Sequence, residues 1–240
     1  MKYTLWSLAI LFFILLVVAI LFFVRFRNAT KAMTPGETAA INDSVWCVKD
    51  NFVNAFIFRG SGGYVMIDAG MNPKNFSKEL AKTGINPDSI GTILLTHTDT
   101  DHIGAIPLFK NAKIYMHKDE EQMINGTTGK MKFIKFHWKF GPYELLSDTD
   151  SLNFGGMDVK MIHTPGHTAG SVCFVVGGDY LVSGDNLILS NGKYEHFVEA
   201  FNMDTEVQKE ALKAIPDISM FKYILTAHNG VIEVAAGEEN

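Results

Sequence analysis

Two imidazoles and two carboxylates fall within six residues, from His97 to His102. They belong to the stretch THTDTDH, residues 96–102, which directly follows three apolar residues. A strand that ends in such a cluster directs several metal-binding groups into one small volume. Desolvated carboxylates and imidazoles at this density are costly unless a bound divalent cation compensates them. The stretch therefore predicts a metal site, and the alternative is a solvated, Asp-rich turn.

Four further segments repeat this arrangement, with an Asp or His next to small residues at the end of an apolar or turn-rich stretch. The residues concerned are Asp68, His167, Asp185 and His228. Strands that end at the same edge of a sheet bring such side chains together. Imidazole nitrogen and carboxylate oxygen are ligands that zinc and iron accept readily. The repetition within one chain is strong evidence for a metal centre.

On these motifs the chain resembles the metallo-β-lactamase superfamily of hydrolases, from about Trp46 to Val234. In that family the first cluster reads His-x-His-x-Asp-His, and later strand ends supply His, Asp and His. The resemblance implies an α/β fold, a four-layer αβ/βα sandwich with two metal ions at one edge of its sheets. It implies one metal on His97 and His167, a second on Asp101, His102 and His228, and Asp185 bridging the two. Asp68 is then a supporting residue that holds the cluster loop.

Asp99 stands where the family usually has its second His. A carboxylate still binds metal, so we expect Asp99 to be a ligand of the first ion; the alternative is that it points away. A carboxylate oxygen is a harder ligand than an imidazole nitrogen. Asp99 therefore shifts the preference of the site from zinc toward iron or manganese. The related diiron flavoproteins resemble this chain in placing a carboxylate there. We expect two divalent ions, with zinc the first choice and iron or manganese the alternatives.

The resemblance implies hydrolysis by a metal-bound hydroxide, with Asp101 orienting the hydroxide and accepting its proton. Asp185 resembles the bridging acid of thioesterases and lactonases, which the true β-lactamases lack. We therefore expect a small-molecule substrate of the ester, thioester or lactone type. Two other classes stay open: an iron-dependent redox enzyme of the same fold, suggested by Asp99, and a non-catalytic metal-binding module.

The N-terminus carries 21 uncharged and mainly apolar residues, from Thr4 to Val24. That length spans a bilayer as a helix. Residues 25–31 make a poor cleavage site, which favours an uncleaved, single-pass anchor over a signal peptide. Three basic residues follow the apolar stretch and only Lys2 precedes it, a weak bias toward a cytoplasmic catalytic domain. We expect an anchor over 1–27, a linker over 28–43 and one hydrolase domain over 44–240.

The charge of the chain argues against a nucleic-acid partner. The formal net charge is −5, and without the basic residues of 1–27 it is −8. Nucleic-acid-binding proteins usually present a basic surface instead. The oligomeric state has no signature in the sequence.

Apolar periodicity and turn residues predict alternating strands and helices. We expect strands over 54–59, 64–68, 92–96, 113–115, 159–163, 171–176, 180–183 and 223–226, and helices over 73–83, 103–109, 118–124 and 205–215. Aromatic and basic residues alternate within the segment 130–143, which is a substrate lid, a membrane-facing patch or an ordinary half-buried strand. The remaining histidines match no metal motif and are expected to be packed or surface residues. They are His117, His137, His163 and His196.

Overall fold

A computed structural model describes residues 2–31, 33–130, 139–148, 152–190 and 193–234. The chain forms two compact units, Met1–Met33 and Thr34–Asn240. The first unit is the single helix α1 (Lys2–Lys31). Its segment Ile10–Asn28 is long and apolar enough to cross a membrane, and a signal sequence meets the same criterion.

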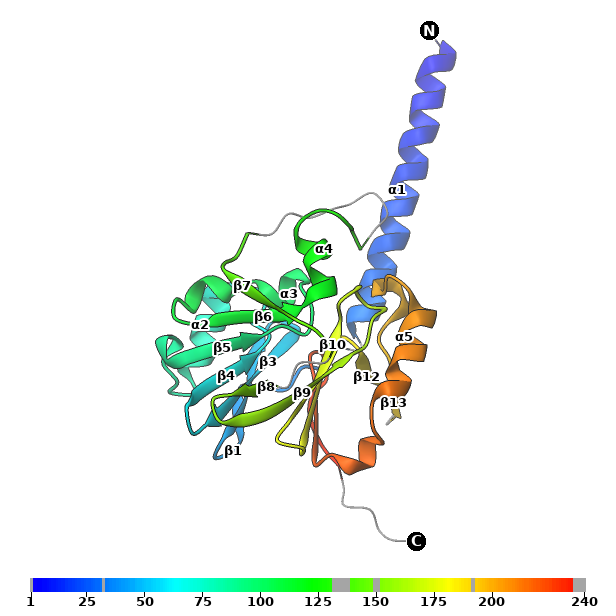
Figure 1. Cartoon of the computed structure of the whole chain (residues 1–240). Helices are drawn as coiled ribbons and strands as arrows, with labels where there is room; N and C mark the ends of the chain where they lie inside the picture. Colours follow the sequence, from blue (N-terminus) through cyan, green and yellow to red (C-terminus); the bar gives the residue numbers. More distant parts are fainter. Residues whose placement is uncertain (1, 32, 131–138, 149–151, 191–192, 235–240) are drawn as a thin grey trace. The chain divides into compact units, whose positions relative to one another are not determined.

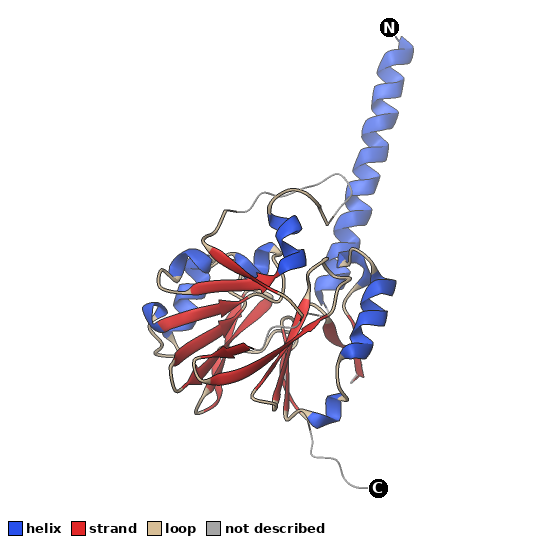
Figure 2. Cartoon of the chain, in the orientation of Figure 1, coloured by secondary structure: helices blue, strands red, loops and turns tan. Residues whose placement is uncertain are grey.

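The second unit contains two large β-sheets (Figures 1 and 2). The first sheet has the order β1-β2-β3-β4-β5-β6-β7. Its strands are Ala39–Asn42, Val45–Asp50, Val53–Gly60, Gly63–Ile67, Ile90–Leu94, Lys113–His117 and Tyr143–Leu146. The second sheet has the order β15-β14-β11-β10-β9-β8. Its strands, in that order, are Gly230–Glu233, Tyr223–Thr226, Tyr180–Gly184, Val172–Val176, Met157–His163 and Leu152–Phe154. A separate hairpin joins β12 (Leu187–Ser190) and β13 (Lys193–His196).

Helices cover the outer faces of the two sheets, and α2 (Pro73–Ala81) shows why one of them forms. Pro73 occupies its first turn, and the Asn72 side chain accepts hydrogen bonds from the backbone N–H groups of Lys74 and Asn75 at 3.0 and 3.1 Å. Phe76 and Leu80 lie one turn apart on one face and are fully buried against the first sheet. The other helices are α3 (Thr100–Ile103), α4 (Glu121–Ile124) and α5 (Thr205–Ala211).

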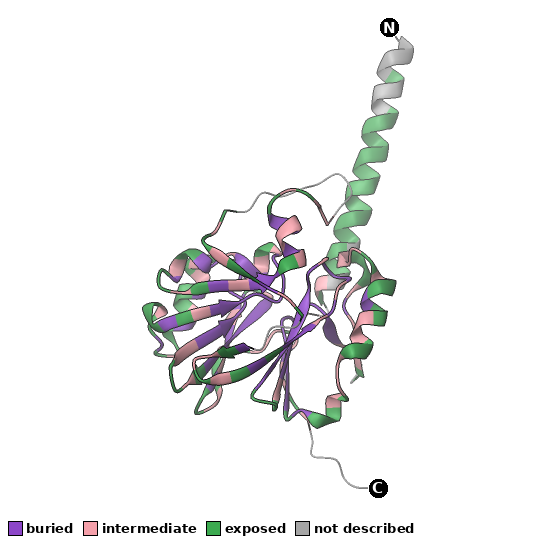
Figure 3. Cartoon of the chain, viewed as in Figure 1, coloured by how far each residue is buried: buried purple, intermediate pink, exposed green. Residues whose placement is uncertain are grey.

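Three apolar clusters define the layers. One lies between α2 and the outer face of the first sheet, and the second lies between the two sheets. The third packs the outer face of the second sheet against Leu212 and Ile215, which follow α5. Every residue of the central strand β10 is buried, as expected for a strand covered on both faces (Figure 3). The four-layer αβ/βα sandwich expected from the sequence is therefore confirmed.

The element boundaries differ from the sequence prediction in two places that matter. The helix expected over 103–109 is two pieces: α3 begins at Thr100, and a 3-10 turn covers Ile106–Leu108. Asp101 and His102 are therefore helical residues. Within the expected linker 28–43, α1 continues to Lys31 and β1 pairs with β2. Pairing with a sheet edge does not require a strong apolar pattern, so β1 left little trace in the sequence.

The aromatic-basic segment 130–143 is described only in part. Residues 131–138 lie outside the described residues, so the three interpretations of that stretch stay predictions. Tyr143 begins β7, which pairs in parallel with β6. Lys130 reaches the metal-site candidates described next.

Candidate metal centre

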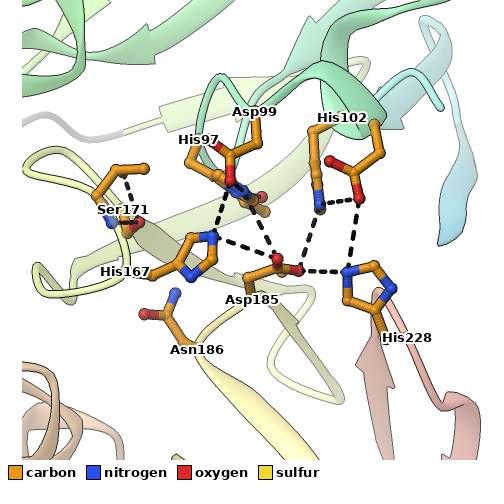
Figure 4. A network of polar contacts seen from close by, with 12 residues as sticks. His97, Asp99, His102, His167, Ser171, Asp185, Asn186 and His228 are labelled. Carbon is orange, nitrogen blue, oxygen red and sulfur yellow. Dashed lines mark hydrogen bonds and ion pairs between the residues drawn. The ribbon is translucent and has the colours of Figure 1, made fainter. Parts of the chain in front are cut away.

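Seven side chains from four segments of the chain converge, and Figure 4 labels six of them. Strand β5 leads into the loop and helix that carry the first four candidates. The β9–β10 loop supplies one imidazole, and the ends of β11 and β14 supply a carboxylate and an imidazole. Strands β11 and β14 are parallel neighbours, so their carboxyl ends lie at the same edge. The seven residues are His97, Asp99, Asp101, His102, His167, Asp185 and His228.

The first group consists of His97, Asp99, His167 and Asp185. Asp99 Oδ2 lies 3.6 Å from His97 Nε2 and 3.1 Å from His167 Nε2. Asp185 Oδ2 lies 3.8 and 3.3 Å from the same two nitrogens. Asp99 therefore points into the group.

The second group consists of Asp101, His102 and His228, and it uses the other oxygen of Asp185. Asp185 Oδ1 lies 3.3 Å from His102 Nε2 and 3.0 Å from His228 Nε2. Asp101 Oδ2 lies 3.8 and 3.7 Å from these nitrogens. The carboxylate of Asp185 thus has one oxygen toward each group, which is the geometry of a bridging ligand.

All four imidazoles are oriented in the same way, by a contact at Nδ1. The partners of His97, His102, His167 and His228 are Thr96 Oγ1 at 3.1 Å, Asp68 Oδ2 at 2.9 Å, Asn202 Oδ1 at 3.1 Å and the carbonyl of Phe52 at 2.7 Å. A proton on each Nδ1 leaves the Nε2 lone pair directed at the carboxylates. Metal-binding histidines typically have such a partner on the nitrogen that does not bind the metal.

Three buried atoms in this cluster make no hydrogen bond among the described residues: His97 Nε2, His102 Nε2 and Asp185 Oδ1. Buried polar atoms are normally paired, because an unpaired one costs about 1–3 kcal/mol. His102 Nε2 lies 3.3 Å from Asp185 Oδ1, and His97 Nε2 lies 3.8 Å from the other oxygen of Asp185. Divalent cations held between nitrogen and oxygen donors satisfy them, so the residues fit a metal centre.

Charge shapes the pKa values in the cluster. Burial lowers the pKa of His102, but the carboxylates of Asp68 and Asp185 outweigh this and hold it well above 6.5. Burial and the nearby charge of Lys130 lower the pKa of His167 to about 4. Burial raises the pKa of Asp185, yet the surrounding imidazoles bring it well below its usual value. The carboxylates therefore favour the charged form of His102, whereas His167 is neutral at pH 7.

Lys130 is a residue of the site that the sequence prediction missed. Its Nζ forms an ion pair with Asp99 Oδ2 and lies 2.7 Å from His167 Nε2. These atoms belong to the first group, so Lys130 supplies a positive charge beside candidate metal ligands. The sequence placed Lys130 in the aromatic-basic segment, and 31 positions separate it from Asp99, so no local pattern indicated the contact.

Glu120 is a second missed residue. It is fully buried and accepts four hydrogen bonds. The donors are the Thr98 backbone N–H at 2.8 Å, Thr98 Oγ1 at 2.7 Å, Thr168 Oγ1 at 2.6 Å and the Gly170 N–H at 3.0 Å. Glu120 therefore ties the loop of His97 and Asp99 to the loop of His167. A Cβ at Gly170 would lie 2.2 Å from the Glu120 nitrogen, so glycine is required for this approach.

A further support comes from the far side of His167. Asn202 Nδ2 donates to Gln208 Oε1 at 2.8 Å, and Gln208 Nε2 donates to the Asp185 carbonyl at 3.1 Å. Phe197 is buried and packs against the rings of His167 and His228, with centroids 5.1 and 5.3 Å apart. These side chains hold two imidazoles in place and shield them from water.

Comparison with known proteins decides the family. The sequence profile of the metallo-beta-lactamase superfamily matches residues 48–219, most of the chain. The chain belongs to this superfamily. The metallo-β-lactamase resemblance of the sequence motifs is thereby confirmed. Members of the fold bind divalent metals, in agreement with the clusters above.

Two curated relatives illustrate the range of this superfamily. A protein of Methanocaldococcus jannaschii described as a probable metallo-hydrolase is 29% identical over 155 residues, 65% of this chain and 64% of that protein. The hydroxyacylglutathione hydrolase of Xylella fastidiosa is 34% identical over 99 residues, 40% of this chain and 31% of that protein. The chain thus spans less than two thirds of the length of either relative.

The fold has close counterparts among solved structures. The metallo-β-lactamase of Cronobacter sakazakii with a HARLDQ motif superposes with a TM-score of 0.61 and 19% identity, over 82% of this chain and 80% of that one. At this identity the similarity shows the fold alone.

Proposed function

We propose that this superfamily member is a membrane-anchored hydrolase that uses two divalent metal ions to cleave a small ester, thioester or lactone. One observation carries the proposal: the two oxygens of Asp185 face two separate groups of imidazoles and carboxylates. A carboxylate in this position would hold two ions close together, as two-metal hydrolysis requires.

His97, Asp99, His167 and Asp185 would hold the first ion, and Asp101, His102, His228 and Asp185 the second. When bound, such ions supply a nucleophilic hydroxide at neutral pH and polarise the oxygen of the substrate. The Nδ1 partners of the four imidazoles fix the direction of each Nε2 atom, so the imidazole rings would need little reorganisation to bind metal.

Asp101 is the residue that we assign to proton transfer. Its side chain is 16% exposed, whereas those of His102 and His228 are 0% and 2% exposed. Asp101 is therefore the member of the second group that a substrate and its attacking water reach. Its carboxylate orients that water and accepts the proton that leaves it.

Lys130 modifies the first metal position. Its ammonium group neutralises Asp99 and contacts His167 Nε2, the same atoms that would hold the first ion. A divalent ion held by these atoms would repel the ammonium group, so Lys130 would have to move away for the first ion to bind. We infer that the first position binds its ion more weakly than the second.

The substrate class rests on the bridging acid and on the relatives. Asp185 lies where it can serve both metal positions, and one relative is named for hydroxyacylglutathione, in which an acyl group is carried on a thiol. Acyl transfer to water is the chemistry that a two-metal site with a carboxylate proton acceptor supports. A small acylated thiol or alcohol is therefore the substrate we propose.

Helix α1 supports the proposal of an anchor. It carries the apolar segment Ile10–Asn28, which has the length of a bilayer span. The proposed anchor is tested by extracting membranes that contain the full chain at alkaline pH. Retention in the pellet supports the anchor, whereas release of a shortened chain identifies a cleaved signal sequence.

The function is tested on the full chain in detergent. Metal content is measured by mass spectrometry, and hydrolysis of an activated thioester and an activated ester is measured before and after chelation. We expect about two ions per chain and turnover that the chelator abolishes. Asp185→Ala should lose at least one ion and lower kcat/KM by at least ~100-fold, the loss of several kcal/mol of transition-state stabilisation. Full activity of this variant without metal would refute the proposal.

A second candidate function is an iron-dependent redox enzyme, and Asp99 favours it. Its carboxylate faces the first group. A carboxylate oxygen is a harder ligand than an imidazole nitrogen, and hard ligands favour iron relative to zinc. Predominant iron in protein prepared without added metal, together with negligible hydrolysis of both substrates, would support this function over the hydrolase.

A further inference from the structure

The Nδ1 partner of His167 differs in kind from those of the other three imidazoles in the metal centre. Those three partners are a carboxylate, a backbone carbonyl and a hydroxyl whose own proton goes to Asp68, so each of them accepts. The partner of His167 is the amide of Asn202, which can present either an oxygen or an NH2 group. The direction of this amide therefore decides which ring nitrogen of His167 carries the proton.

The surroundings of Asn202 fix the direction of its amide. Its Nδ2 lies 2.8 Å from Gln208 Oε1 and 3.2 Å from both the Phe197 carbonyl and Thr205 Oγ1. The carbonyl only accepts, and a turned amide would place Oδ1 against it. Asn202 therefore directs its NH2 group away from His167. Its Oδ1, 3.1 Å from His167 Nδ1, accepts the ring proton.

The direction of the Gln208 amide is fixed in turn by Asp185. Gln208 Nε2 donates to the backbone carbonyl of Asp185 at 3.1 Å. That carbonyl has no proton to donate, so Oε1 is the atom of Gln208 that faces Asn202. Hydrogen bonds of one direction thus run from His167 through Asn202 and Gln208 to Asp185. Both end residues belong to the first group of candidate ligands.

Lys130 gives independent evidence for the same tautomer. Its Nζ lies 2.7 Å from His167 Nε2, and an ammonium group only donates. Nε2 therefore accepts, and the single proton of a neutral ring lies on Nδ1. The opposite tautomer would place an N–H group against the ammonium group and leave Nδ1 opposite the oxygen of Asn202. A neutral imidazole is the form that binds metal, and here its lone pair is on Nε2.

We propose that Asn202 and Gln208 are positioning residues that fix the tautomer of His167 and so prepare it to bind the first ion. Asn202 acts on His167 directly, and Gln208 acts through Asn202. Asp185 then takes part twice, through its carboxylate at the metal positions and through its backbone carbonyl in this chain of hydrogen bonds. The inference deepens the proposed function and rests on its first metal position.

The fold holds both residues against the loop of His167. Gln208 is fully buried on the short helix α5, where an unpaired amide would cost free energy. The backbone N–H groups of Met203 and Asp204 donate to the carbonyls of His167 and Gly166, at 3.2 and 2.9 Å. A Cβ at Gly166 would lie 2.4 Å from the Gln208 nitrogen, so glycine is required for this approach. The position of the two amides relative to the imidazole is therefore determined by backbone contacts.

The test reads the proton on His167 and the affinity of its metal position, in the full chain in detergent. Histidine is labelled with ¹⁵N for NMR, and His167→Gln assigns the ring resonances of His167. Gln208→Met keeps most of the side-chain volume and removes both hydrogen bonds. Asn202→Leu removes the acceptor of the ring proton. Glu206→Met places methionine on the exposed face of α5 and is the matched control.

In the metal-stripped wild type we expect His167 to carry its proton on Nδ1 and to exchange it slowly with water. In Gln208→Met and Asn202→Leu this proton should exchange faster. The affinity for the zinc ion that His167→Gln weakens should also fall, by about 10–100-fold. Glu206→Met should match the wild type in both measurements. A proton on Nε2 of the wild type, or equal exchange and affinity in Gln208→Met and Glu206→Met, would overturn the proposal.

A double variant separates positioning from packing. Because Gln208 acts through Asn202, Gln208→Met should weaken the binding of that ion no further when Asn202→Leu is already present. A packing role would make the two losses additive, and additive losses would also overturn the proposal. Neither measurement uses a substrate. A zinc-loaded chain that hydrolyses neither ester nor thioester would refute the proposed function, whereas the proton on His167 in the stripped chain still decides the role of these amides.

Discussion

Asp68 Oδ2 lies 2.9 Å from His102 Nδ1, and both side chains are buried. Asp68 also accepts two hydrogen bonds from Thr96. The backbone N–H donates to Oδ1 at 2.8 Å, and the hydroxyl donates to Oδ2 at 2.8 Å. One carboxylate thus orients His102, a candidate ligand of the second group, and fixes the loop that leads to the first group. Its own backbone has φ 61°, a conformation that is rare for residues other than glycine. Such strain is characteristic of functional sites.

The first prediction follows from this contact. In Asp68→Asn an amide NH2 replaces one oxygen and faces a donor, so either His102 or Thr96 loses its acceptor. We expect zinc affinity to fall about 10–100-fold, the usual cost of losing such a supporting residue. Competition with a chromophoric chelator measures it. Asp88→Asn, which changes an exposed carboxylate, is the control, and equal zinc affinity in the two variants would contradict the role of Asp68.

Lys130 gives the second prediction. Lys130→Met removes the ammonium group from Asp99 and His167, so a divalent ion no longer competes with it. We expect the affinity for the more weakly bound ion to rise at least ~10-fold, which corresponds to about 1.4 kcal/mol. Titration of metal-stripped protein with zinc measures this. Lys139→Met removes an exposed charge and is the control. Unchanged affinity in Lys130→Met would show that Lys130 does not compete with the ion.

Glu120 gives the third prediction. Its four donors match a carboxylate, and in Glu120→Gln one oxygen becomes an NH2 group that at least one donor must face. A buried unsatisfied group costs about 1–3 kcal/mol, so the Tm should fall by several degrees. Thermal unfolding of the metal-stripped chain measures it. Glu210→Gln alters an exposed, 74% accessible residue and should shift the Tm by little. A similar Tm for the two variants would refute the role of Glu120.

These contacts show what the sequence could predict. The motifs at and near strand ends located all seven residues that the structure brings together. They come from both sheets and from the β9–β10 loop, so their convergence also depends on how the two sheets pack. Asp68 was also placed correctly beside them. The four-layer fold came from the family resemblance, and the patterning alone agreed with it without specifying the topology.

Lys130 and Glu120 could not be predicted in this way. Each is a polar residue in a polar stretch, and each acquires its role through contacts with residues at least 22 positions away. The contact between the rings of His117 and His163 has the same origin, because it requires the packing of the two sheets against each other. Helix α3 was expected to begin after His102 because four residues are too few for a periodic pattern.

The last prediction concerns pH and the metal-stripped chain. His102 is held well above its usual pKa of 6.5, because the carboxylates of Asp68, Asp185 and Asp101 outweigh its burial. His228 is also raised, since Asp185 outweighs its burial. A raised pKa means that the folded chain binds protons more tightly than the unfolded chain. The stabilisation is complete below pH 6.5 and is lost as the pH rises toward the folded pKa.

We therefore expect the Tm of the stripped chain to fall as the pH rises from about 6.5 to 9. With zinc present the trend should be opposite, because binding displaces the same protons and strengthens as the pH rises. Differential scanning fluorimetry with chelator or with zinc measures both trends. His102→Gln, which has no ring to protonate, should show a shallower fall without metal. A fall equally steep in His102→Gln and in wild type would mean that other groups cause it and that the carboxylates do not hold a proton on this imidazole.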